Sequence, residues 1–432
     1  MIRLDGAVGQ EMNRKLTVAA VSVLLGSVSS GLAVAADYPP SAKTGPADPA
    51  MQGVLERTRP PGIPVGSFVF LPSLFASAGY NTNITASGTN EKADTLFIVR
   101  PAAQLESNWT RHYLSFDAYF ESGTYADYST ANWENYSVGT NARIDVTADF
   151  EILGYARFAH LNELPGDDET NTGLTSPLPY DQTTAGVGFR KEFNRLWTRV
   201  LFDYRDRSYD TWLDGAPTNQ QYRDGQDYTV SGRVGYFISP LTSVFVEGKY
   251  EWSFMEDTNY DAEQYWVTTG LQFEPSRLTR GEVFVGYTDW SSDGSLDSVP
   301  HFTYGANLNW FATPLLTVTF TALQDVLTSN YSFGGVDGSS VLSSTFGIRG
   351  DYEWRRNVLL SAWFSYNNQD YYNMPRNDDQ YTAGAELRYL INRYATARLT
   401  YNYTDYSSNF NGINGVEDYD QSIVSAGIVL TY

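Results

Sequence analysis

Cysteine and histidine, two side chains often used for nucleophilic and acid–base chemistry, are absent or scarce in this chain of 432 residues. There is no cysteine, and the three histidines, His112, His160 and His301, lie far apart in the sequence. None of them lies in an HExxH spacing, no GxSxG sequence occurs, and the acidic runs lack the spacing of an EF-hand loop. We therefore expect no catalytic residue, no metal ion and no cofactor, and we do not expect an enzyme.

Charged side chains recur instead at every second position of alternating segments. In "ATARLTYNYTDY", residues 395–406, Leu399 and Tyr401 share one parity, whereas Arg398 and Thr400 share the other. A period of two is typical of a β-strand with one apolar and one polar face. Any chemistry of this chain is therefore expected on the polar faces of its strands.

The polar faces carry charges of both signs, which suits a wall that lines water. We expect ion pairs between neighbouring strands there, and the alternatives are a transverse field or a track that binds sugars along a pore. The residues predicted to line this interior are Arg143, Arg199, Arg205, Arg233, Lys249, Arg349, Arg388, Arg398, Asp117, Glu247, Glu251 and Glu386. The aromatic residues on the same faces, which could stack on sugar rings or fill space, are Tyr113, Tyr119, Trp197, Trp266 and Trp363.

Alternating segments of this kind run from Ser67 to the end of the chain. We predict eighteen strands, near residues 67–80, 93–107, 112–124, 133–146, 150–160, 181–193, 196–209, 226–238, 243–255, 263–274, 280–290, 300–311, 315–326, 341–354, 357–368, 380–391, 395–406 and 419–432. Eight connections between them are tight, and nine are longer and rich in Gly, Asp and Asn. This alternation is typical of an outer-membrane barrel with short periplasmic turns and long extracellular loops. The predicted fold is all-β, a closed antiparallel transmembrane β-barrel of about 18 strands over residues 67–432.

The apolar faces of these strands are expected to contact lipid rather than a second sheet. A soluble sandwich would be joined by Greek-key crossovers, and a propeller blade of similar period would hold four short strands instead of two long ones. Aromatic residues gather near the predicted strand ends, where interfacial girdles belong. The last segment, "SIVSAGIVLTY", places Tyr432 on the apolar parity, which resembles the signal that barrel-assembly machinery recognises.

The N-terminal region differs in composition from the rest of the chain. Met12 to Lys15 is a short basic stretch, "LTVAAVSVLLGSV" is apolar, and "GLAVAAD" offers a cleavage site after Ala35 or Ala36. We predict a signal peptide over residues 1–36, in which 1–11 are an upstream extension. Residues 37–66 are rich in proline and are predicted to form an extended periplasmic segment.

Charge and hydropathy exclude two classes of protein. The formal charge of −21 argues against nucleic-acid binding, because phosphate contacts need a basic surface. Mean hydropathy is −0.35, and outside the leader no apolar run is long enough for a helical span, so a helical membrane bundle is excluded.

Four stretches resemble a known family in their order and spacing. They are "GIPVGSFVFLPSLFASAGYNTNI", "RPAAQLESNWTRHYLSFDAY", "ENYSVGTNARIDVT" and "FRKEFNRLWTRV". They are similar to the outer-membrane β-barrel porins of Gram-negative bacteria, in the group often linked to exopolysaccharide export operons. The likeness is strongest over residues 62–200 and continues as a pattern to Tyr432. The family has no established catalytic residues, so the resemblance implies a location and an architecture.

Pattern and resemblance together predict a porin-like channel in the cell outer membrane that passes hydrophilic solutes. The alternative is an outer-membrane conduit for exopolysaccharide export. The partners expected are outer-membrane lipid and lipopolysaccharide, the barrel-assembly machinery and, for the alternative function, polysaccharide export partners.

Overall fold

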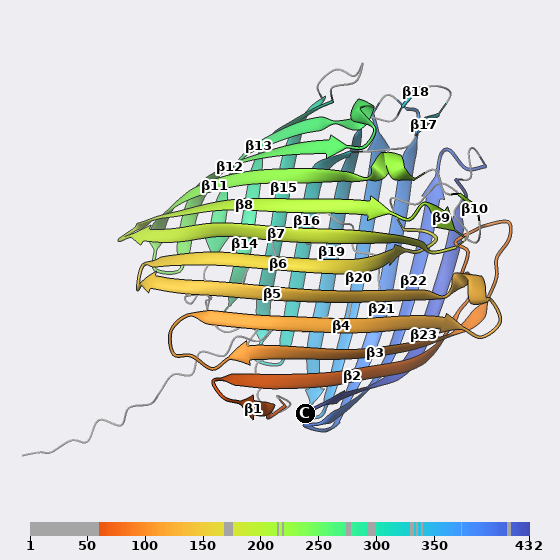
Figure 1. Cartoon of the computed structure of the whole chain (residues 1–432), viewed down its shortest axis with the longest axis horizontal. Helices are drawn as coiled ribbons and strands as arrows, with labels where there is room; N and C mark the ends of the chain where they lie inside the picture. The colour runs from red at the N-terminus through yellow and green to blue at the C-terminus, as the bar shows by residue number, and fades with distance from the viewer. Residues whose placement is uncertain are drawn as a thin grey trace, which may run out of the picture.

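The structure is a computed structural model that describes residues 60–167, 176–213, 216–217, 220–273, 278–292, 299–328, 332–333, 336–337, 340–372, 374–412 and 416–432. Within these residues, eighteen long antiparallel strands close into one barrel (Figure 1). The strands are β2 (Phe68–Asn81), β3 (Asp94–Ser107), β4 (Tyr113–Tyr125), β5 (Trp133–Thr147), β6 (Phe150–Glu163), β7 (Leu178–Phe193), β8 (Leu196–Tyr209), β11 (Gly225–Ser239), β12 (Thr242–Met255), β13 (Ala262–Phe273), β14 (Thr279–Ser292), β15 (Val299–Thr313), β16 (Leu316–Thr328), β19 (Ser340–Arg355), β20 (Val358–Tyr371), β21 (Asn377–Asn392), β22 (Ala395–Ser408) and β23 (Tyr419–Thr431).

The barrel closes where the first and last long strands meet. β2 pairs with β23 from Ser73 opposite Thr431 to Asn81 opposite Ile423, so the start of β2 extends past the end of β23. One extra strand, β1 (Ile63–Val65), pairs with this overhang, with Val65 opposite Phe68. An unpaired strand edge in or near lipid leaves backbone hydrogen bonds unmade, and β1 removes that defect at the seam.

Connections are short at one end of the barrel and longer at the other (Figure 1). β7 and β8 are joined by two residues, because the ladder begins with Phe193 opposite Leu196. Asn194 in this hairpin has a φ of 59°, a left-handed conformation that asparagine adopts more readily than most residues. The longer connections contain η2 (Ser129–Ala131), η3 (Gln221–Arg223), η4 (Thr258–Tyr260) and two small hairpins, β9 (Trp212–Leu213) with β10 (Ala216–Pro217) and β17 (Ser332–Phe333) with β18 (Val336–Asp337).

The predicted fold class is confirmed, and each predicted strand matches a long strand with ends within three residues of the expected ones. The pattern did not predict β1, which lies in the segment read as an extended lead-in, or the small loop hairpins. The predicted signal peptide and residues 37–59 lie outside the described residues, as do residue 274 of one predicted strand and residues 275–277 of the predicted tight turn 275–279. No helix in the described ranges is long and apolar enough to cross a membrane.

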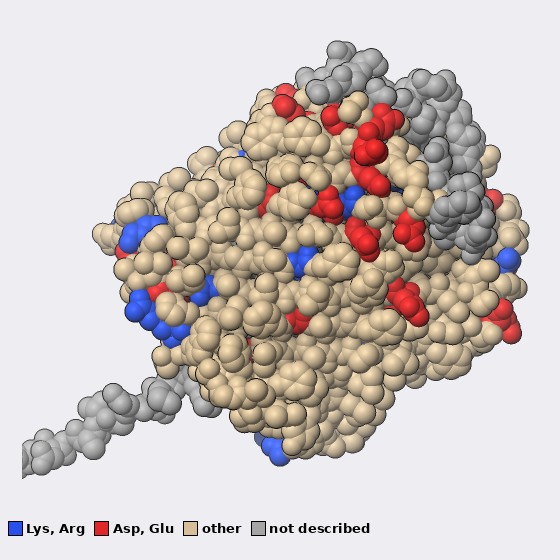
Figure 2. All heavy atoms as spheres, in the orientation of Figure 1, with Lys and Arg blue, Asp and Glu red and all other residues tan. Residues whose placement is uncertain are grey.

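The outer surface of the barrel is largely an apolar band, with charges most frequent toward its margins. Exposed large hydrophobic residues such as Val138, Val246 and Phe302 stand along the middle of the strands. On the face shown in Figure 2, most Lys and Arg gather toward the end with tight turns, and Asp and Glu gather toward the end with long loops. This distribution is the one that a barrel spanning a bilayer requires.

Candidate functional site: the inner wall

The inner wall is formed by the strand parity that alternates with the exposed apolar one. In β22, Leu399 is 53% exposed, whereas Thr400 beside it is 9% exposed. Side chains of this second parity reach one another across intervening strands, as when Arg157 of β6 donates to Asp117 of β4 at 2.8 Å. Such contacts are possible only on the concave face of a closed sheet, so this parity points into the barrel.

All twelve residues predicted to line the interior lie on this parity, and each has an ion-pair partner. The pairs are Arg143–Asp145, Arg157–Asp117, Arg199–Glu247, Arg205–Asp227, Arg233–Glu247, Arg233–Glu282, Lys249–Glu251, Arg349–Asp351, Arg388–Glu386 and Arg398–Glu386. The structure pairs these charges both between strands, as in Arg157–Asp117, and within one strand, as in Arg349–Asp351. The role of these residues as the lining of a conducting pathway remains a prediction.

One continuous chain of alternating charges spans β19 to β22. Glu386 binds both Arg398 and Arg388, and the second of these pairs has an Nε to Oε1 distance of 2.8 Å. Arg388 continues to Asp351 at 3.7 Å, and Asp351 binds Arg349 at 3.0 Å. The three arginines are partly exposed, whereas Glu386 is buried at the centre of the chain. Charges that alternate at this spacing keep the wall hydrated without a large net field.

The five inward aromatic residues each have a cation over the ring. The distances from the cation to the ring centroid are 3.7 Å for Lys249 and Trp266, 4.2 Å for Arg100 and Tyr119, 4.8 Å for Arg190 and Trp197, 5.2 Å for Arg349 and Trp363, and 6.0 Å for Arg143 and Tyr113. These distances fall in the range of cation–π contacts. The ring faces are therefore occupied by the protein's own cations and are not open platforms for a sugar.

Glycine alternates with aromatic residues along one row of the inner wall. The ladder places Trp197 opposite Gly235, Gly235 opposite Phe245, and Phe245 opposite Gly270. The row continues through Phe284 to Gly305. A Cβ atom on Gly235 would lie 2.2 Å from the indole of Trp197, closer than real Cβ contacts allow. The missing side chains therefore let the rings lie flat against the wall, an arrangement known as aromatic rescue of strand glycine.

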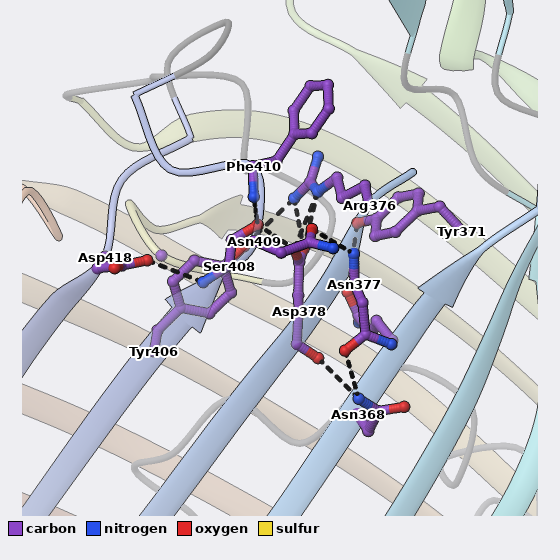
Figure 3. Close-up of polar contacts among 12 residues, drawn as sticks. Asn368, Tyr371, Arg376, Asn377, Asp378, Tyr406, Ser408, Asn409, Phe410 and Asp418 are labelled. Carbon is purple, nitrogen blue, oxygen red and sulfur yellow. Dashed lines mark hydrogen bonds and ion pairs between the residues drawn. The ribbon is translucent and has the colours of Figure 1, made fainter. Parts of the chain in front are cut away.

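Two arginines of the loop end are buried in matching surroundings, and one of them is drawn in Figure 3. Arg376 binds Asp378 through Nε at 2.9 Å and Nη2 at 2.5 Å, and its guanidinium lies 4.3 Å from the ring centroid of Tyr371. The phenol of Tyr406 accepts a further hydrogen bond from Arg376 at 3.3 Å. A buried guanidinium with a bidentate carboxylate partner is a rigid junction between loop and wall.

The second junction joins β6, β8 and η3. Arg223 donates to both carboxylate oxygens of Glu163, at 2.7 and 2.9 Å, and stacks over Tyr209 at 4.2 Å. Sequence analysis did not single out Arg223 or Arg376, because both lie in loops where no periodicity assigns a face. Both arginines stand just before an acid near the start of a strand, in "RND" and "RDG", but Arg376 pairs with that acid whereas Arg223 pairs with the distant Glu163.

Loops from distant parts of the chain also meet at this end. Glu417 accepts hydrogen bonds from Ser87 at 2.5 Å and Thr89 at 2.8 Å, which lower the pKa of its carboxyl below the usual value. The turn after β6 approaches the same corner, where the hydroxyl of Tyr419 donates to the carbonyl of Gly166 at 3.1 Å. Leu164 of this turn packs on the inward residues Phe75, Ile98 and Trp133. The turn therefore lies against the inside of the wall near the loop end.

A closed antiparallel barrel with an apolar outer band and a polar, ion-paired interior is an outer-membrane β-barrel of the porin class. The chain belongs to the family described as "Putative beta-barrel porin 2", whose sequence model matches residues 58–432. It is thus a porin-like outer-membrane channel, as the resemblance predicted.

Solved structures similar to this chain include outer-membrane porins and siderophore receptors. OccAB3 of Acinetobacter baumannii is 12% identical, with 85% of this chain and 100% of that chain covered and a TM-score of 0.46. OpdK of Pseudomonas aeruginosa is 13% identical, with 84% and 99% covered and a TM-score of 0.46. A BenF-like porin of Pseudomonas fluorescens Pf-5 is 11% identical, with 84% and 99% covered and a TM-score of 0.47. A search among curated proteins finds no match, and none of these comparisons supports the alternative of exopolysaccharide export.

Proposed function

We propose that this protein lets small hydrophilic solutes cross the outer membrane through the interior of the barrel. The observation that carries the proposal is the inner wall itself, whose charged residues are ion-paired and in part accessible, as with Arg157 and Asp117 at 26% and 27% exposed. A wall of this kind favours water over apolar filling. Barrels of 16 to 18 strands are wide enough to hold an aqueous channel.

The proposed role needs no bond-making step. We therefore propose a channel without enzymatic activity, in keeping with the family description. Two of the histidines make structural contacts. The ring of His160 stacks on that of the outward-facing Tyr136, with the ring centroids 4.9 Å apart, and the ring of His112 accepts a hydrogen bond from the backbone N–H of Asp145.

We also propose that the protein reaches the outer membrane by export and assisted assembly. Residues 1–36 would be removed as a signal peptide, and Tyr432 would present the assembly signal. Tyr432 is exposed and stacks on Tyr394 of the last tight turn at 5.7 Å, which holds the C-terminal aromatic in place. The expected mature N-terminus is residue 36 or 37, and N-terminal sequencing of protein purified from outer membranes checks it.

Single-channel recording tests the proposed function. Purified full-length protein, shown to be folded by its heat-modifiable migration, should give stepwise conductance in planar bilayers. Liposomes containing it should swell in small neutral sugars and swell less as sugar size increases. Folded, inserted protein that neither conducts ions nor admits sugars would overturn the proposal.

A further inference from the structure

The ladder between β15 and β16 stops short of the loop end. Among the described residues it ends with Tyr304 opposite Gln324, although β15 continues along β14 as far as Val299. In the same part of the chain, residues 325–328 of β16 pair with residues 340–343 of β19 and not with β15, and we call these two segments the tip hairpin. The wall of the barrel is therefore split beside the tip hairpin, at the end with long loops.

The tip hairpin leans into the barrel. Val326 and Leu342 lie opposite each other on the parity that faces lipid lower in the same strands, where Phe320 is 39% exposed. Val326 is nevertheless only 2% exposed, because it packs with Trp290, an inward residue of β14, and Leu342 packs on the same cluster. The outer face of the tip hairpin thus lies against the inner face of the neighbouring wall.

Two side chains bind the backbone groups of β16 that β15 would otherwise bind. The amide of Gln264, on β13, donates to the carbonyl of Val326 at 3.1 Å. The carboxylate of Asp325 accepts the N–H of Val326 at 2.9 Å and the indole N–H of Trp266 at 2.8 Å. The N–H and C=O of one residue point to the same side of an antiparallel strand, so both groups of Val326 face the split. These side chains therefore satisfy the tip hairpin in its inward position.

The same two strands also have a sequence that suits an unbroken wall. Continuing their register by two residues would place Phe302 opposite Val326. Phe302 is 59% exposed on the lipid side, and Val326 would lie beside it there. Asp325 would face the interior, so the alternation of apolar outward and polar inward residues would continue to the loop end. The backbone of Phe302 would replace the two side chains as the hydrogen-bond partner of Val326.

We propose that the tip hairpin is a gate with two positions, one folded into the mouth of the barrel and one zipped onto β15 as part of the wall. Val326 has backbone partners in both positions, so neither position leaves its hydrogen-bonding groups unmade. The inward position replaces ladder hydrogen bonds by the packing of Val326 and Leu342 on Trp290, and two such states can coexist. The inward position narrows the mouth, and the zipped position widens it. The proposal rests on the proposed channel function and adds its regulation.

Cysteine cross-linking of the folded full-length protein in liposomes detects the two positions, because the chain has no cysteine of its own. Phe302→Cys with Val326→Cys reports the zipped position, since these side chains lie on opposite sides of the wall when the hairpin is inward. Ala262→Cys with Val326→Cys reports the inward position, where both residues belong to one buried cluster. A short bifunctional thiol reagent should cross-link both pairs. Failure of either pair, while the ladder pair Tyr304→Cys with Gln324→Cys cross-links, would overturn the proposal.

Conductance of the cross-linked channels in planar bilayers tests what the movement does. Locking the Phe302 pair should raise the single-channel conductance, and locking the Ala262 pair should lower it, each compared with the same variant before cross-linking. Conductance that neither lock changes would remove the gate and leave the channel function standing. Protein that forms both cross-links but never conducts would remove the channel function and leave the two positions of the hairpin.

Gln264→Leu tests the inward position without a cross-link in it. The change removes the donor to the carbonyl of Val326, so a buried acceptor loses its partner in the inward position alone. In the variant with Phe302→Cys and Val326→Cys, it should speed zipped cross-linking about tenfold. Gln272→Leu, on the same face at the other end of β13, should change that rate by no more than about twofold. Equal rates in the two variants would overturn the proposal.

Discussion

Charged residues of this barrel differ in how deeply they are buried. On the inner wall, Arg157 and Asp117 are 26% and 27% exposed. Partly exposed pairs of this kind contribute about 0–1 kcal/mol each, so they serve hydration of the wall more than its stability. At the loop end, Arg376 and Asp378 are fully buried. Removing one partner of a buried pair leaves an uncompensated charge and costs about 3–5 kcal/mol.

Asp378→Asn should therefore act locally and strongly. It removes the carboxylate that Arg376 binds and that Ser408 donates to at 2.6 Å. We expect the free energy of local opening at the loop ends of β20 to β22 to fall by about 3 kcal/mol or more, measured by hydrogen exchange. Asp117→Asn is the control and should cost about 1 kcal/mol or less. Equal effects of the two changes would contradict the assignment of Arg376 as a buried junction.

Glu417 makes the contact between the first and last long loops sensitive to pH. Its pKa in the folded protein is lowered from the ordinary value of 4.5, mainly by the hydrogen bonds from Ser87 and Thr89. A lowered pKa means that the contact is fully stabilised above about pH 4.5 and weakens as pH falls through the folded value. Exchange protection of Gly88 and Thr89, corrected for intrinsic rates, should be constant from neutral pH and fall only in acid. Glu417→Gln should show lower protection at neutral pH and no such fall.

At the scale of elements, the strands depend on one another through register. Within a strand the period of two settles which residues face inward, but the neighbour's register settles what each inward residue touches. The glycine–aromatic row is one result, since each ring needs a glycine on the next strand at the same level. The ladder positions of Arg190, Arg199 and Arg233, which lie opposite one another on three neighbouring strands, are another.

Gly235→Ala tests the element scale. The new Cβ would lie 2.2 Å from the indole of Trp197, so the ring must leave the wall or the strand must shift. We expect a loss of about 1–3 kcal/mol in unfolding free energy, measured by urea titration in lipid vesicles. Gly232→Ala on the same strand has no atom within 4 Å of its Cβ and should change stability by no more than about 0.5 kcal/mol. Unchanged stability and an unmoved Trp197 fluorescence in Gly235→Ala would contradict the flat packing.

At the scale of the whole molecule, closure of the barrel decides which end carries the long loops and which end carries the tight turns. Because β2 and β23 pair antiparallel, and β2 begins and β23 ends beside the tight turns, the long loops share the opposite end (Figure 1). In an outer-membrane barrel the long loops face the outside of the cell. The acidic margin in Figure 2 then lies outward and the basic margin faces the periplasm.

The absence of cysteine from the sequence makes this orientation easy to test. Thr130 lies in the exposed loop after β4, and Asn357 lies exposed in the tight turn between β19 and β20. A membrane-impermeant maleimide should label Thr130→Cys on intact cells and should label Asn357→Cys only after the outer membrane is permeabilised. The reverse pattern would mean that the barrel is inverted relative to this assignment.

The sequence by itself determined the features that depend on neighbours along the chain. Alternation in "ATARLTYNYTDY" assigned Leu399 to the lipid side and Arg398 to the interior without knowledge of any other strand. The alternation of short and long connections predicted that the strands are antiparallel, and it predicted their number. These are local properties, because backbone geometry alone turns successive side chains to opposite faces.

Only the tertiary structure decided what lies side by side. Nothing in the sequence around Arg199 shows that Arg190 and Arg233 flank it, or that Gly235 lies under Trp197. Loop residues such as Arg376 had no period to assign them a face, although Arg376 binds Asp378 through both Nε and Nη2 at the loop end. The physical reason is that register and loop packing are fixed by hydrogen bonds and side-chain contacts between segments far apart in the chain. No single stretch of sequence contains both partners of these contacts.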